Sequence, residues 1–188
     1  IHHDLSKIPE MIWVKRRETS GSHWRVYHKG LNGGTNPEQY RLLLDSNGQE
    51  ELGSTLWNDT APNSNVFIVG SNNDVNSASG SYIAMLFASV DGISKCGFYD
   101  GSDSELTITT GFQPRFVILK RVSGSDPWFV LDTTRGWGSG NDQYLQLQAT
   151  DAQTGYDFGA PTSTGFTLVG NVDSFNANGQ QYIYYAHA

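Results

Sequence analysis

Residues 74–88 read DVNSASGSYIAMLFA, and residues 173–188 read DSFNANGQQYIYYAHA. Both stretches place an Asp before small polar residues and Asn, then a Gly, then Tyr-Ile and an apolar run that closes on Ala. The two tyrosines, Tyr82 and Tyr182, lie 100 positions apart. The Asn, Asp and Gly cluster predicts a tight loop, and the run after it predicts a strand. The same loop and strand are therefore expected twice.

The repeat extends outward from these two stretches through most of the chain. IPEMIWVKRR (residues 8–17) matches QPRFVILKRV (residues 113–122), and further motifs follow in the same order. The matched pairs are Pro9 and Pro114 at an offset of 105, Trp24 and Trp128 at 104, Tyr40 and Tyr144 at 104, and Pro62 and Pro161 at 99. A period of about 100 residues far exceeds the roughly 20 to 50 residues of solenoid units, so each copy is a whole sheet-sized unit.

These patterns predict an all-β fold with almost no helix. Each copy holds about five strand signals, from the continuous apolar runs MIWVK and FVILK to the alternating YRLLLD and YLQLQ, which gives ten to twelve antiparallel strands. We predict a first repeat at residues 1–92, truncated at its N-terminal strand, and a second at residues 93–188. Together they are expected to form one antiparallel β-sandwich unit, lectin-like or jelly-roll-like.

Residues 95–112 (KCGFYDGSDSELTITTGF) have no counterpart in the first copy, because their matched positions would precede Ile1. An absent strand leaves an open sheet edge, and an open edge invites pairing with another chain. We expect Ile1 to lie at a junction with more protein or with a partner subunit.

Composition excludes several kinds of partner. The net charge is −7 and the isoelectric point is near 5.0, without a Lys/Arg stripe, which argues against nucleic-acid binding. No apolar run approaches the roughly 18 residues that a membrane helix needs, so no membrane insertion is expected. Cys96 is the only cysteine, so no intrachain disulfide can form. The fold depends on packing and backbone pairing.

We expect no catalytic residue, no cofactor and no metal site. Nucleophile-elbow, zinc-protease and P-loop motifs are missing, and the loop GWGSG (residues 136–140) lacks the strand–helix context of a dinucleotide site. The five histidines are dispersed along the chain. The acidic loops at residues 71–80 and 100–105 are predicted to be hydrated turns, with calcium binding by their oxygen atoms left open.

The motifs resemble those of a known family. PEMIWVKRR, TLWNDTAP and VFIVG, followed by GFQPRFVILKR and FNANGQQYIYYAHA, are similar to a duplicated domain of unknown function found in virion proteins of tailed phages, many of them marine. The similarity covers nearly the whole chain. It implies a phage structural or adhesion module without known catalytic residues.

This resemblance predicts a non-enzymatic module of a tail fibre, spike or surface decoration on the virion, in contact with a host cell-surface glycan. Its expected partners are other virion proteins and further copies of itself, a trimer being favoured in a fibre. Two alternatives stay open at this point. One is a glycan-degrading tailspike-type hydrolase, and the other is a purely structural capsid or tail decoration protein.

The repeat also serves as an internal control for aromatic residues. An aromatic present in both copies is expected to serve the fold, which predicts that Trp13, Trp24, Trp57 and Trp128 are mostly buried. Trp137 has no matched aromatic, since Gly33 stands opposite it in the first copy. We therefore predict a ligand or partner contact loop at Trp137 with Arg135 and Asp142 beside it. The alternative is that Trp137 folds back onto the end of its own domain.

Overall fold

The computed structural model describes all of residues 1–188, and it is almost entirely antiparallel β-structure. It contains 14 strands, one four-residue α-helix and three short 3-10 helices. The chain divides into two compact units, Ile1–Ala88 and Ser89–Ala188, which we call unit 1 and unit 2. The all-β prediction is confirmed.

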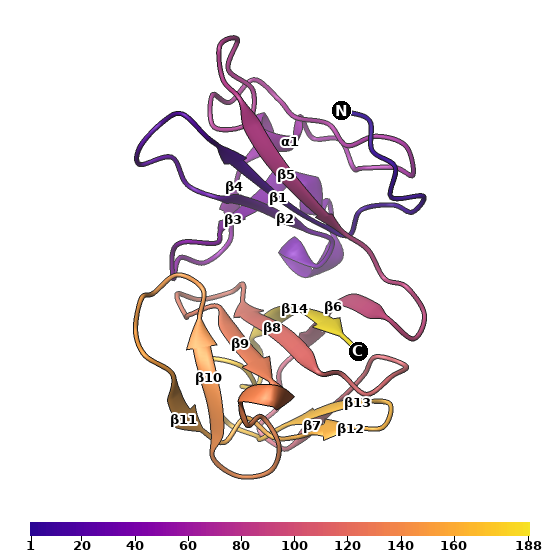
Figure 1. The fold of residues 1–188 in the computed structure, drawn as a ribbon, viewed down its shortest axis with the longest axis vertical. Helices are drawn as coiled ribbons and strands as arrows, with labels where there is room; N and C mark the ends of the chain where they lie inside the picture. The colour runs from indigo at the N-terminus through magenta and orange to yellow at the C-terminus, as the bar shows by residue number, and fades with distance from the viewer. The chain divides into compact units, whose positions relative to one another are not determined.

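Unit 1 is built on one five-stranded sheet of order β4-β3-β2-β1-β5 (Figure 1). Its strands are β1 (Met11–Arg16), β2 (Arg25–His28), β3 (Tyr40–Leu43), β4 (Glu51–Leu52) and β5 (Tyr82–Phe87). The helices η1 (Leu31–Gly34), η2 (Pro37–Gln39) and α1 (Ser54–Trp57) lie in its loops.

Unit 2 contains a six-stranded sheet of order β11-β10-β9-β8-β14-β6 and a three-stranded sheet of order β12-β13-β7 (Figure 1). Its strands are β6 (Ser94–Asp100), β7 (Leu106–Thr109), β8 (Phe116–Arg121), β9 (Phe129–Asp132), β10 (Asp142–Gln146), β11 (Thr154–Tyr156), β12 (Pro161–Thr162), β13 (Gly165–Leu168) and β14 (Gln181–His187). The helix η3 (Thr133–Arg135) follows β9.

The two larger sheets share one strand order and one register over five strands. In unit 1, Met11 of β1 pairs with His28 of β2 and Phe87 of β5. In unit 2, Phe116 of β8 pairs in the same way with Asp132 of β9 and His187 of β14. Strands β1, β2, β3, β4 and β5 therefore match β8, β9, β10, β11 and β14. Strand β6, at the outer side of β14, has no match in unit 1.

Each unit has its own hydrophobic core. In unit 2, the core joins buried residues of both sheets, among them Leu119 of β8, Tyr184 of β14 and Phe166 of β13. Burial is continuous from Val117 to Lys120, as expected for a strand covered on both faces. The core of unit 1 gathers residues of β1 and β2 around Trp57.

The repeated loop and strand are held together by their tyrosine. The Tyr82 hydroxyl donates to the Asn73 carbonyl at 2.7 Å and accepts the Ser77 N–H at 2.6 Å. The Tyr182 hydroxyl donates to the Asp173 carbonyl at 2.6 Å and accepts the Ala177 N–H at 3.0 Å. A tyrosine at the start of each strand, the first residue of β5 and the second of β14, thus fixes the loop before it.

The structure also departs from the sequence-based expectations. Residues 95–112 form two strands, β6 and β7, where one was expected, and VFIVG in unit 1 forms no strand beyond a bridge from Val66 to His2. The sheet registers match Leu42 to Leu145, since these residues pair with Val26 and Val130. The counterpart of Tyr144 is therefore Arg41. The prediction that both repeats form one sandwich together stays a prediction.

The tryptophan predictions hold in part. Trp57 and Trp128 are buried, whereas Trp13 and Trp24 are partly exposed. None of the helices in the structure has the length and apolar character needed to cross a bilayer.

Candidate functional site

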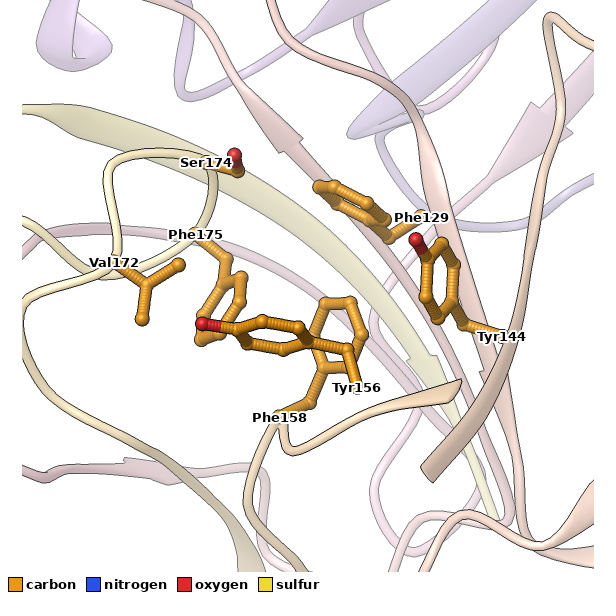
Figure 2. A pocket seen from close by; sticks show the side chains of 7 residues that line it. All are labelled: Phe129, Tyr144, Tyr156, Phe158, Val172, Ser174 and Phe175. Atoms are coloured by element: carbon orange, nitrogen blue, oxygen red, sulfur yellow. The ribbon is translucent and has the colours of Figure 1, made fainter. Parts of the chain in front are cut away.

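An aromatic-lined pocket opens on unit 2 beside β9, β10 and β11. Its volume is about 270 Å³, just below the roughly 300 to 1,000 Å³ of most ligand pockets. Figure 2 shows that its walls come from these strands and from the two loops that follow β11 and β13. The lining residues are Phe129, Tyr144, Tyr156, Phe158, Val172, Ser174 and Phe175.

Most of the aromatic rings pack edge to face, and Phe158 and Phe175 are tilted by 30°, so the rings hold one another in place. Phe158 lies at the centre, with ring centroids 5.1 Å from both Phe129 and Tyr144 and 4.5 Å from Phe175. The Tyr156 ring lies over Phe158 at 5.7 Å. These interactions preorganise the walls, because turning one ring would break contacts with its neighbours.

The pocket offers apolar faces and hydroxyl groups but no charge. Tyr156 is 46% exposed, while Phe158 and Phe175 at the floor are buried. The hydroxyls of Tyr144, Tyr156 and Ser174 form no hydrogen bond within the protein, so they can donate to and accept from a ligand. This combination suits a neutral, polyhydroxylated molecule with an apolar face.

Asp142 fixes the turn that carries Phe158. It is 1% exposed, and its carboxylate accepts the N–H groups of Gly138 and Phe158, both at 2.8 Å. Burial raises the pKa of this carboxyl, and the two backbone hydrogen bonds oppose the rise. Asp142 therefore acts beneath the pocket, by positioning Phe158.

The expectation of an exposed Trp137 ring is wrong. The side chain is 2% exposed, its Nε1 donates to the Gly159 carbonyl at 3.0 Å, and its ring meets Phe166 edge to face at 6.0 Å. Trp137 thus folds back into the core of its own unit, which is the alternative given in the sequence analysis. Of the three predicted contact residues only Arg135 is exposed, and its guanidinium lies 3.5 Å from the Gln153 side-chain oxygen.

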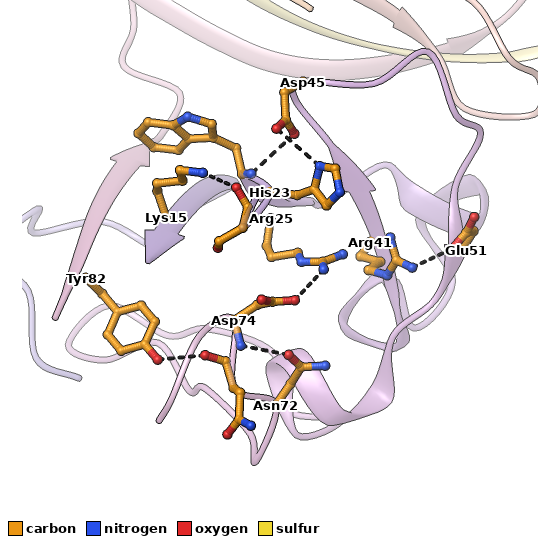
Figure 3. A network of polar contacts seen from close by, with 12 residues as sticks. Lys15, His23, Arg25, Arg41, Asp45, Glu51, Asn72, Asp74 and Tyr82 are labelled. Carbon is orange, nitrogen blue, oxygen red and sulfur yellow. Dashed lines mark hydrogen bonds and ion pairs between the residues drawn. The ribbon is translucent and has the colours of Figure 1, made fainter. Parts of the chain in front are cut away.

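The matched positions of unit 1 hold a charged network instead of an aromatic pocket. The sheet register matches Arg25 to Phe129 and Arg41 to Tyr144. The offset of 100 matches Asp74 to Ser174. Figure 3 shows Arg25 directed at Asp74, with which it forms an ion pair, and Arg41 paired with Glu51. The aromatic set is therefore not required by the shared sheet.

A second hollow of about 330 Å³ lies at Gln113, Pro114, Arg115 and Thr133. It has no aromatic wall, so the pocket at Tyr156 is the stronger candidate for a binding site. Nowhere in the chain do three His, Cys, Asp or Glu side chains gather as metal ligands.

Sequence reasoning missed the aromatic pocket in part because it matched Tyr144 to Tyr40, so Tyr144 did not count as an aromatic residue of one copy alone. The usable signal was Phe129 against Arg25. An aromatic residue in one repeat that is matched by a charged residue in the other cannot be explained by a core that both repeats share.

No curated protein and no solved structure gave a significant match to the chain. One family model does match, and it spans residues 1–188, the full length of the sequence. The chain belongs to the family described as a domain of unknown function, DUF7483.

Proposed function

We propose that this chain is a non-enzymatic structural and adhesion module of a phage virion, placed in a tail fibre, a spike or a surface decoration, and that it contacts a host cell-surface glycan. The observation that carries the adhesion role is the aromatic pocket of unit 2. The virion assignment rests on the sequence resemblance.

A glycan fits the chemistry of the pocket. Aromatic faces pack against the C–H faces of a sugar ring, while sugar hydroxyls need donors and acceptors such as Tyr144, Tyr156 and Ser174. The absence of charge in the lining favours a neutral sugar over a sialic or uronic acid. The volume of about 270 Å³ accommodates one sugar unit rather than an extended chain.

We also propose that the two units arose by tandem duplication and that the second unit is a two-layered β-sandwich of lectin-like or jelly-roll-like type. The shared strand order and register support the duplication, and the two sheets around the core of unit 2 support the sandwich. In this view the pocket is a specialisation of the second copy.

The expected partners are neighbouring virion proteins and further copies of the chain. A trimer would repeat the pocket three times around a fibre axis. Such repetition raises the avidity of weak single-site binding.

The test is a glycan array probed with the intact chain, followed by titration of each sugar that binds. Tyr156→Ala removes the exposed wall of the pocket and is expected to weaken binding about tenfold. Phe98→Ala is the matched control, because Phe98 is an equally exposed aromatic, also at 46%, outside the pocket in the same unit. Equal binding by wild type and Tyr156→Ala would show that the pocket is not the glycan site.

A further inference from the structure

The outer edge of β5 in unit 1 is open, although the matching edge in unit 2 is covered. Strand β14 pairs with β8 on one side and, over seven residues, with β6 on the other. Strand β5 pairs with β1 alone. The two sheets thus differ at one edge: β14 in unit 2 has β6 as an outer neighbour, and β5 in unit 1 has no strand on that side.

The main-chain N–H and C=O groups on the open side of β5 are oriented to pair with such a strand. The Arg17 N–H donates to the Ser81 carbonyl at 3.0 Å, which turns the main-chain groups of residue 81 toward β1. Because these groups alternate in direction along an antiparallel strand, those of Tyr82, Ala84 and Leu86 point to the open edge. In unit 2 the main-chain groups of the matched residues 182, 184 and 186 point toward β6. The hydrogen bond from the Gly101 N–H to the Gln180 carbonyl, at 2.9 Å, indicates this alternation.

The side chains of β5 are also incompletely covered. Tyr182 is 0% exposed and stacks on Tyr99 of β6 at 5.0 Å, whereas Tyr82 is only partly buried. Ile83 and Met85, on the other face of β5, are 42% and 40% exposed. An apolar strand edge left open in this way is a pairing surface.

One position gives a strand beside β5 a specific chemistry. Gly97 of β6 lies opposite Tyr184, and a Cβ at Gly97 would collide with the Tyr184 ring. The residue matched to Tyr184 is Ala84, which is exposed. The ring that forces glycine in unit 2 is therefore absent in unit 1, and a strand beside β5 has room for a large side chain there.

Residues 1–3 already follow the path of β7. His2 bridges Val66, and the Phe67 N–H donates to the Ile1 carbonyl at 3.1 Å, just as β7 runs antiparallel to β13 at the matched Phe166. In unit 2, β6 lies directly before β7 in the chain. A strand on β5 would therefore lie in the same relation to residues 1–3 as β6 does to β7.

We propose that β5 is an acceptor edge for an extended segment of β6 type. The segment runs antiparallel to β5, carries an aromatic side chain opposite Tyr82 as Tyr99 does opposite Tyr182, and carries a large apolar side chain opposite Ala84. Main-chain hydrogen bonds supply the affinity and the side chain opposite Ala84 supplies the selectivity.

The experiment adds synthetic peptides to the intact chain. The first peptide has the sequence of residues 93–101 with Cys96→Ser to prevent oxidation, the second carries Gly97→Leu in addition, and the third carries Gly97→Pro. Amide hydrogen exchange reports on Ala84 and Leu86. The first two peptides are expected to protect both amides, with the leucine peptide binding about tenfold more tightly. The proline peptide, which lacks the N–H at the central position, is expected to protect neither.

An Ala84→Tyr variant supplies the reciprocal test. It restores the ring that unit 2 has at Tyr184, so the preference should reverse toward the glycine peptide. The proposal is overturned if no peptide slows exchange at Ala84 and Leu86, or if the proline peptide protects them equally. It is also overturned if these amides become protected without peptide as the protein concentration rises, because a second copy would then occupy the edge.

Discussion

Replacing Tyr182 with Phe removes one oxygen atom and tests the idea that the tyrosine holds the repeated loop to its strand. Tyr182 is 0% exposed, and its hydroxyl has two partners, the Ala177 N–H and the Asp173 carbonyl. Each buried polar group left without a partner costs about 1–3 kcal/mol, and Ala177 is itself only 6% exposed. We expect the free energy of unfolding of unit 2 to fall by about 2–4 kcal/mol.

The matched variant Tyr82→Phe is the control. Tyr82 is only partly buried and its hydrogen bond to Asn73 is solvent-exposed, so water can replace the lost hydroxyl. Its cost should be about 0.5–1.5 kcal/mol. Urea denaturation followed by hydrogen exchange at Ala177 measures both. Equal costs for the two variants, or an unchanged exchange rate at Ala177 in Tyr182→Phe, would refute the reasoning.

Two further predictions concern buried residues of unit 2. Trp128→Ala should lower the free energy of unfolding by about 3–5 kcal/mol, because Trp128 is buried. Trp24→Ala should lower it clearly less, because Trp24 is only partly buried. Urea titration of both variants measures the difference. Burial lowers the pKa of Lys120 from 10.5 to about 8, so between those values the folded chain binds fewer protons than the unfolded chain, and stability should rise with pH. Urea unfolding midpoints at pH 8 and pH 10 measure this rise in stability, and the rise should be absent in the Lys120→Met variant. If the variant shows the same rise, the pH dependence belongs to other titrating groups.

The sequence predicted the strands well where the signal is local. The continuous runs MIWVK and FVILK became β1 and β8, and the two Tyr-Ile runs became β5 and β14. Apolar pattern alone decides such strands. It could not separate β6 from β7, because their boundary depends on the pairing of β7 with β13, about 60 residues later.

The candidate site was predictable only in part. Asp142 and Trp137 were predicted to be contact residues, but both are buried, and their roles come from contacts with Phe158 and Gly159 that no sequence spacing reveals. Whether a loop tryptophan faces solvent or the core depends on the carbonyl that its N–H reaches. Likewise, the one-residue shift that aligns Arg41 with Tyr144 is visible only in the sheet register.

The open edge at β5 also bears on how the protein must be handled. Its six residues, YIAMLF, contain no charge, no proline and no glycine, which is the composition of segments that stack into intermolecular β-aggregates. Nothing on the strand itself acts as a gatekeeper against that outcome. A segment of β6 type that covers β5 would therefore also shield YIAMLF from such stacking, and a charged residue at Met85 would give similar protection when the chain is handled alone.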